Sequence, residues 1–264
     1  MRRTIVGAVV QREFREILRN RLLLLTVVVP PLILTAMPIV LLAVAGQVTG
    51  RVPPGAVEQI VASHPDWADM TGPQVIAAFA LQQFLATFLI LPAYIPLAIA
   101  TYSIVGEKQT RSLEAVLATP IRTTELLAGK AIASLAPGIA SAWISYLAMV
   151  GLAVGLLGGR LSLVLAEPTW FAAVFALGPA IGLVSVTAGI VVSSRVNDPR
   201  VAQQIGAVIL LPIIGLVVLQ SIGTFLLDVP AYLAIALVVF VIGLIGIRIG
   251  AALFGRETIL TRWK

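Results

Sequence analysis

The sequence contains no cysteine, a single histidine and few charged residues. Of its 264 residues, 11% are charged and 59% are hydrophobic, and the mean hydropathy is +1.04. Without cysteine the chain has neither a disulfide framework nor a thiolate metal site. In soluble globular domains roughly a quarter of the residues are charged. The composition of this chain therefore excludes that class and predicts a membrane protein.

Charge is also missing from six long apolar stretches. They run over residues 22–45, 75–105, 131–157, 168–194, 201–227 and 230–247. Each approaches or exceeds the length of about 20 helical residues that crosses a hydrocarbon core. Within these boundaries there is no Asp, Glu, Lys, Arg or His. An ion-driven carrier usually keeps a charged group in the membrane, so a self-powered transporter is disfavoured, although sodium coupling through backbone carbonyls stays open.

Catalytic groups are equally scarce. The one histidine, His64, lies in a loop beside Pro65 and Asp66, so a serine hydrolase inside the bilayer would have no histidine base. We expect His64 to be an ordinary surface residue, with a catalytic or metal-binding role as the alternative. No G-x-x-x-x-G-K-[ST] nucleotide motif occurs either. The sequence therefore predicts a chain that is not itself an enzyme and that binds no metal or cofactor.

Lysine and arginine gather on one side of the predicted membrane. The segments between spans alternate, so that 16 of the 18 basic residues fall on the side that holds both termini. The positive-inside rule makes that side cytoplasmic. The first span has 24 residues, more than the apolar core of a signal peptide, so we expect it to be retained. The expected fold class is an all-α polytopic membrane protein with six transmembrane helices and both termini in the cytoplasm.

Residues 1–21 predict an amphipathic helix that lies in the inner membrane interface before the six-span domain, residues 22–264. Two stripes occur at helical spacing. The apolar stripe consists of Val6, Val10, Phe14 and Ile17, and the basic one of Arg12, Arg15 and Arg19. Such a helix places its apolar face among the lipids. The alternative is a basic leader that only sets the topology.

Residues 106–130 form the most charged stretch, with seven of the chain's thirty charged residues. The pattern predicts a helix from Glu107 to Ala118 that ends at Thr119, because the following proline disfavours helical geometry there. A second helix begins at Thr123 or Thr124, has Glu125 in its positive first turn, and continues into the third span. This structured break favours a docking surface over a simple connector, and both readings stay open.

Neutral polar and small residues remain within the spans. Hydrogen bonds between helices account for the glutamines, and a place on a substrate pathway is the alternative for Gln82, Gln83 and Gln220. Three glycine pairs at four-residue spacing predict close helix contacts. They are Gly151 with Gly155, Gly178 with Gly182, and Gly246 with Gly250.

The charged stretch resembles the cytoplasmic segment between spans two and three of ABC-2 type permeases, the membrane subunits of type-2 ABC exporters. The resemblance is carried by Glu107-Lys108, Ser112-Leu113-Glu114, Val116-Leu117, Thr119-Pro120, Glu125-Leu126-Leu127 and Gly129-Lys130. Similar too are the leading helix with Glu13-Phe14-Arg15-Glu16 and the run over residues 193–200. Order and topology match over the whole chain. Thr110-Arg111 departs from the pattern, since many members have a glycine-containing turn there.

The resemblance implies that residues 107–123 are a coupling segment that docks on a separate ATPase subunit. The side chains concerned are Glu107, Arg111, Leu113, Glu114, Leu117, Thr119 and Pro120. The interfacial helix beside it would contribute Arg12, Phe14, Arg15 and Arg19. ATP and Mg²⁺ would be bound by the ATPase and not by this chain.

The same resemblance implies an export function in the plasma (inner) membrane of a prokaryote. The partners would be the ATPase, a second copy or a similar permease, and membrane lipid, with no nucleic acid. The rival readings are a secondary transporter or channel that needs no ATPase and, third, an intramembrane hydrolase.

Overall fold

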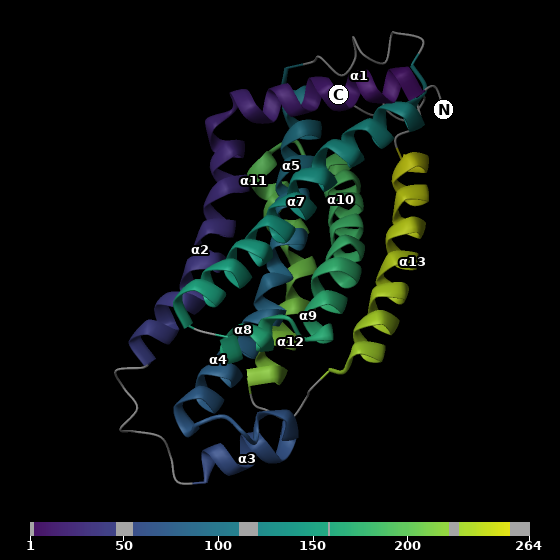
Figure 1. The fold of residues 1–264 in the computed structure, drawn as a ribbon. Helices are drawn as coiled ribbons and strands as arrows, with labels where there is room; N and C mark the ends of the chain where they lie inside the picture. Colours follow the sequence, from purple (N-terminus) through teal and green to yellow (C-terminus); the bar gives the residue numbers. More distant parts are fainter. Residues whose placement is uncertain (1–2, 46–54, 111–120, 158, 222–226, 254–264) are drawn as a thin grey trace.

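The computed structural model describes residues 3–45, 55–110, 121–157, 159–221 and 227–253 (Figure 1). Every regular element in these ranges is a helix. Among the described residues, six helical segments are long and apolar enough to cross a membrane. The expectation of an all-α protein with six spans is therefore confirmed.

The first two helices meet at a single residue. Helix α1 (Arg3–Arg19) lies across one end of the bundle, and α2 (Arg21–Ala45) leaves it along the bundle (Figure 1). Between them, the Asn20 side-chain oxygen accepts hydrogen bonds from the backbone N–H groups of Leu22, at 3.0 Å, and Leu23, at 3.3 Å. Asparagine is a favoured N-cap because it satisfies N–H groups that a helix start leaves unpaired. The cap therefore fixes where the chain turns into the first span.

The second span is divided into two helices, α4 (Gly72–Phe88) and α5 (Ile90–Gln109). Thr71 begins α4 with a capping box that it shares with Gln74. The division falls at Leu89, three residues before Pro92. A proline ring clashes with the carbonyl of the residue four positions earlier, here Phe88, which is the last residue of α4. The sequence predicted one span over residues 75–105, and the structure shows this break within it.

The remaining elements complete the six spans. The third span is α7 (Thr123–Leu157), and the sixth is α13 (Val229–Leu253). The fourth consists of α9 (Pro168–Phe171), the π-helical turn η3 (Ala172–Leu177) and α10 (Gly178–Arg195). The fifth consists of α11 (Pro199–Gly206), the 3₁₀ turn η4 (Ala207–Leu210) and α12 (Leu211–Ser221). Shorter helices α3 (Ala56–Ser63), η2 (Pro65–Trp67) and α8 (Gly159–Leu165) lie outside the spans.

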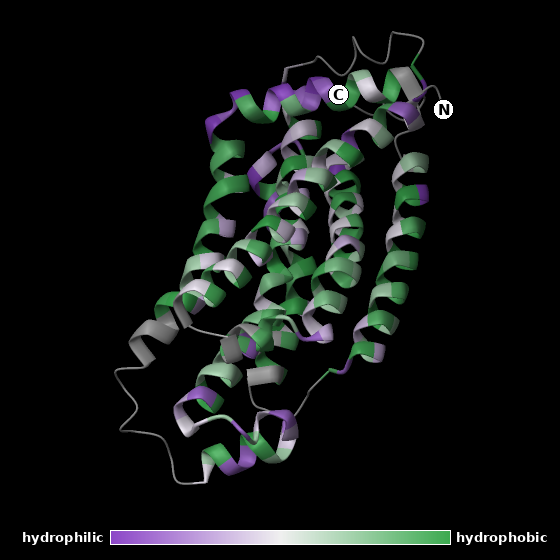
Figure 2. Ribbon diagram, in the orientation of Figure 1, coloured by the Kyte–Doolittle hydropathy of each residue, from purple (hydrophilic) through white to green (hydrophobic). Residues whose placement is uncertain are grey.

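Polar residues are concentrated at the two ends of the bundle, as Figure 2 shows by the purple segments of α1 and α3. We call the end that α1 crosses the α1 end, and the opposite one the α3 end. Between them the helices are mainly apolar and green in Figure 2.

Helix α5 is the central helix of the bundle. In the span that contains α5, 78% of the 18-residue apolar stretch is buried inside the protein. The corresponding share is 17% in each of the first, fifth and sixth spans. Glycines let neighbouring helices approach it closely: Gly138 of α7 contacts the Pro96 ring, and Gly206 of α11 contacts Leu97. The lack of a side chain at these glycines is what permits the close approach. Movement of α5 would therefore displace α7 and α11 as well.

Two of the three predicted glycine pairs pack as expected. Gly178 and Gly182 both approach Pro92. Gly246 and Gly250 of α13 approach α10, at Thr187 and at Ile190 with Val191. A side chain at Gly151 or Gly155 would meet no other atom within 4 Å in the part of the chain that the structure describes.

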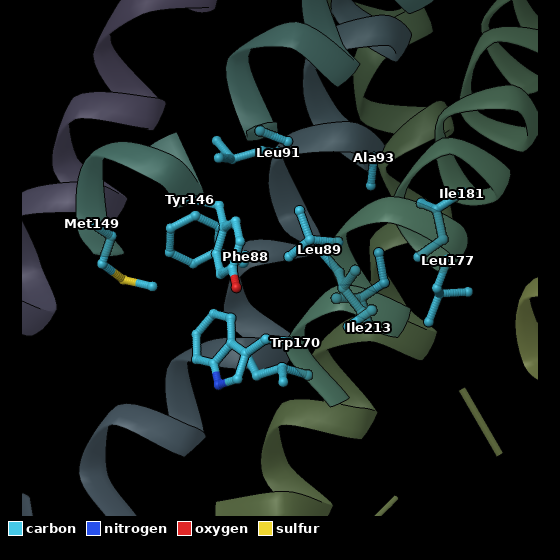
Figure 3. Close-up of a cluster of buried hydrophobic side chains, with 14 of the residues drawn as sticks. Phe88, Leu89, Leu91, Ala93, Tyr146, Met149, Trp170, Leu177, Ile181 and Ile213 are labelled. Carbon is cyan, nitrogen blue, oxygen red and sulfur yellow. The ribbon is translucent and has the colours of Figure 1, made fainter. Parts of the chain in front are cut away.

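An aromatic cluster fills the core between α4, α7 and α9 (Figure 3). The fully buried Trp170 ring lies 5.8 Å from the Tyr146 ring and 5.9 Å from the Phe88 ring, measured between centroids. The Tyr146 hydroxyl donates a hydrogen bond of 2.6 Å to the Leu165 carbonyl oxygen. A buried hydroxyl needs such a partner, so this bond fixes the end of α8 relative to α7.

We predict that Gly138→Val destabilises the protein by about 1–3 kcal/mol, the usual cost of overpacking a filled core. The added Cβ would overlap the Pro96 ring, which is rigid and lies in the middle of α5. Thermal unfolding of purified protein measures the loss. The control is Gly151→Ala, which adds a methyl group where the described structure leaves room and should not lower the unfolding temperature. Equal stability of Gly138→Val and wild type would contradict the close contact.

Candidate functional site: the charge network at the α1 end

Charged side chains from α1, α5 and α7 meet inside the protein at the α1 end. The centre is the Lys130 ammonium group on α7, which is 2% exposed. It lies 2.7 Å from the Glu13 carboxylate of α1 and 3.0 Å from the Glu107 carboxylate of α5. It also donates a hydrogen bond of 2.6 Å to the Ser103 hydroxyl of α5. The Lys130 ammonium group thus donates hydrogen bonds to Glu13 and Ser103 and forms an ion pair with Glu107.

The other members of the network have polar or charged neighbours as well. The Ser103 hydroxyl donates to the second oxygen of Glu13 at 2.7 Å. The Arg12 guanidinium forms an ion pair of 3.1 Å with Glu107 and remains partly exposed. Two positive and two negative charges thus balance within the cluster. Buried ions are tolerated in proteins only when they are paired in this way.

A third carboxyl group, that of Glu16, borders this network. Burial raises the pKa of Glu16, and the neighbouring Glu13 and Glu107 carboxylates raise it further, against lowering contributions from Lys130 and Arg12. Glu16 lies on an exposed part of α1. Loss of hydration is the larger cause of the raised pKa, and repulsion from the neighbouring carboxylates adds to it.

The last turn of α5 makes contacts on two opposite sides. Glu107 faces α1 and α7, while the next residue, Lys108, reaches the end of α10. The Lys108 ammonium donates to the carbonyl oxygens of Ser193, of Ser194 at 3.0 Å, and of Val196 at 3.3 Å. Because α5 ends one residue after Lys108, both contacts lie directly before residues 111–120.

Helix α1 presents the residues of the predicted interfacial helix on different faces. Ile17 is buried against the bundle and Phe14 is half-buried. Arg15 and Arg19 are exposed, whereas Arg12 pairs with Glu107. The separation of apolar and basic residues agrees with the sequence pattern, and a membrane interface around α1 stays a prediction.

Most of the predicted coupling segment lies outside the described residues. This holds for Arg111, Leu113, Glu114, Leu117, Thr119 and Pro120. Of that set the structure places Glu107, which is 3% exposed and belongs to the buried network. Beyond the segment, α7 begins at Thr123 with Glu125 in its first turn, which confirms the second helix predicted there.

A separate polar cluster lies at the α3 end. The Glu167 carboxylate accepts hydrogen bonds from the Trp67 indole N–H, at 3.3 Å, and from the Gln82 amide, at 3.4 Å. The His64 ring stacks on Trp67 with centroids 4.0 Å apart. Burial raises the pKa of Glu167 despite these bonds, and burial lowers the pKa of His64. Glu167 thus connects η2, α4 and the start of α9.

The three glutamines of the predicted substrate pathway have different positions. Gln82 belongs to this cluster at the α3 end, and Gln83 is its half-buried neighbour on α4. The side chain of Gln220 lies outside what the structure describes. Among the described residues, no group of three or more His, Asp and Glu side chains could hold a metal ion.

Sequence reasoning missed the network around Lys130, although one signal pointed to it. Glu13 lies on the apolar stripe of α1, three residues after Val10 and four before Ile17. A lone carboxylate on a face that packs against the protein requires a buried partner. A helical projection that included the charged residues would have singled out Glu13, but not Lys130 as its partner.

Comparison with known proteins identifies one relation. The model of a family described as "ABC-2 family transporter protein" matches residues 7–231, most of the chain. No curated protein matches the sequence. The matched range contains every member of the charge network.

We predict that Lys130→Met destabilises the protein by about 3–5 kcal/mol, because Glu13 and Glu107 would be left as buried carboxylates around an uncharged side chain. Lys130→Arg should lose less, since it keeps the charge. Thermal unfolding measures both variants, with Arg15→Met as the control for removal of an exposed cation from the same end. A Lys130→Met protein as stable as the control would show that the network contributes no net stability.

A further prediction concerns the pH dependence of stability. Because the pKa of Glu167 is raised above its ordinary value of 4.5, this group stabilises the fold below about pH 4.5, and that contribution is lost as the pH rises through the folded-state pKa. Glu167→Gln keeps an acceptor for Trp67 and does not titrate. Relative to the variant, wild type should therefore become less stable as the pH increases from 4.5 to neutral. Unfolding temperatures at a series of pH values measure this, and a difference that does not change with pH would contradict it.

Proposed function

The chain belongs to the ABC-2 family of transporter proteins, and we propose that it is an exporting permease driven by ATP hydrolysis in a separate ATPase subunit. The six apolar helices identify it as a multi-pass membrane protein. The ATPase would bind ATP and Mg²⁺. This chain would provide the path through the membrane.

The observation that carries the proposal is the fixed position of the last turn of α5. Glu107 is held by Lys130 and Arg12, and Lys108 by the end of α10, directly before the segment that would dock on the ATPase. A segment that only connects two spans needs no such anchoring. Anchoring on both sides suits a segment that must pass force into the bundle.

The α1 end is assigned to the cytoplasm in this proposal. It carries Arg12, Arg15, Arg19, Lys108 and Lys130, and positively charged residues mark the cytoplasmic side. Both termini would lie there, in the plasma membrane of a prokaryote. An ATPase has access to its nucleotide only on this side.

The proposed mechanism begins when ATP closes a pair of ATPase subunits against residues 107–123. Because Glu107 lies in the last turn of the central helix, the push reaches α5 and the helices whose glycines pack on α5. A second copy of this chain, or a similar permease, would complete the path, since six spans are half of the usual twelve. Gln82, Gln83 and Gln220 are candidate contacts for the substrate, and lipid surrounds the assembly.

We predict that Glu114→Arg and Leu117→Pro leave the protein inserted in the membrane but uncouple it from the ATPase. Charge reversal would disturb the docking surface, and proline would break a helix over this segment. The measurements are co-purification with the ATPase and stimulation of ATP hydrolysis by membrane extracts or candidate substrates. Both should fall at least about tenfold, which corresponds to 1.4 kcal/mol of binding energy.

Glu58→Arg is the matched control, because it reverses an exposed charge at the α3 end, far from the ATPase. It should bind and stimulate like wild type. Normal coupling in both coupling-segment variants would show that the segment is only a connector. Transport along an ion gradient by the purified chain alone would favour the secondary transporter instead.

A further inference from the structure

The contact between Lys108 and α10 joins two parts of the chain that are distant in sequence. The carbonyl oxygens of Ser193, Ser194 and Val196 end α10 and begin the turn before α11. The last carbonyls of a helix have no partner within the helix, and a cation placed there interacts favourably with the helix dipole. Lys108 therefore acts as a C-terminal cap supplied by a different span.

A second contact of α5 continues this junction into the turn. The Gln109 amide donates a hydrogen bond of 3.0 Å to the Asn197 carbonyl oxygen. Asp198 then begins α11, where its carboxylate accepts from the backbone N–H of Arg200 at 2.7 Å. The last two residues of α5 thus hold the whole turn from the end of α10 to the start of α11.

Helix α11 is packed against the protein on one side and exposed on another. On one side Gly206 packs on Leu97 of α5. On the other side Val201 and Ile205 are 42% and 49% exposed in the single chain. Helix α11 packs on both α5 and α10, and the turn held by Lys108 adds a polar contact at the start of the fifth span.

We propose that Lys108 is a positioning residue that transmits movement of residues 107–123 to the turn between α10 and α11, so that the fifth span moves with the docking segment. This inference rests on the proposed function, because it needs an ATPase that moves the segment. The proposed role of Lys108 differs from that of a purely structural cap in one respect. A structural cap stabilises α10 in every state, whereas a transmitting residue determines how far α11 moves when nucleotide binds.

The absence of cysteine from the chain makes the movement measurable. Cysteines introduced at Gln59 of α3 and Val201 of α11, both exposed, would be the sole sites for a pair of spin labels, and α3 lies at the opposite end of the bundle from the docking segment. The labelled chain is assembled with its ATPase and an excess of unlabelled chain, so that each complex holds at most one labelled copy. Pulsed electron paramagnetic resonance then gives the distance between the labels without nucleotide and with a non-hydrolysable ATP analogue.

Three variants separate transmission from capping. Lys108→Met removes the donors and the charge at similar length, Lys108→Arg keeps both, and Arg195→Met removes an exposed cation from the last turn of α10. We expect the nucleotide-dependent change in distance to be lost in Lys108→Met. It should be retained in Lys108→Arg and Arg195→Met. If Lys108→Met does not fold, Lys108→Gln, which keeps donors without charge, takes its place and should show a reduced change.

Co-purification of the ATPase is measured on the same samples. A Lys108→Met complex that keeps its ATPase and the full change in distance overturns the inference and leaves the proposed function intact. A wild-type complex that binds ATPase but shows no change overturns the inference as well, because the fifth span does not move. A chain that binds no ATPase overturns the proposed function and the inference together.

Discussion

The bond between the Lys130 ammonium group and the Glu13 carboxylate holds the rest of the α1 end in place. It fixes α1 to α7, and through Ser103 and Glu107 it fixes both to α5. A buried ion without its partner would destabilise the fold by several kcal/mol. Helices α1, α5 and α7 can therefore pack here only when all three contribute their side chains. The position of α1 across the bundle is therefore a consequence of charge pairing and not only of its apolar face.

The central position of α5 gives that pairing its importance. Helices α7, α10 and α11 approach α5 through glycines, so their backbones lie too close to move independently along this contact. The last turn of the same helix contains Glu107 and Lys108. Glu107 contacts α1 and α7, and Lys108 contacts the end of α10 and the turn before α11. One turn of helix thus connects both sides of the bundle to the segment that follows it.

Hydropathy and charge predicted the six spans, the helix that crosses the α1 end and the start of α7, because each depends on local composition. The break at Leu89 was harder to predict. Pro92 removes the hydrogen bond to the Phe88 carbonyl, but α2 and α7 continue through their own prolines. The partners of Lys108 could not be predicted from the sequence. They are backbone carbonyl oxygens about 85 positions away, and every residue has such an oxygen, so no side-chain pattern reveals them. Glu13 was visible on its apolar stripe, but which cation would pair with it depends on how α7 packs.

The pairing around Glu13 also has a consequence for biosynthesis. Glu13 leaves the ribosome 90 residues before Ser103 and 117 residues before Lys130, so its final partners do not exist while the first span is being inserted. During that interval α1 must remain at the membrane surface, where water can solvate its carboxylate. Only when the third span enters the bilayer can α1 dock. Helix α1 therefore reaches its final position only after α7 has been synthesised. The nascent chain must pass through a stage in which α1 is made but not yet docked on the bundle.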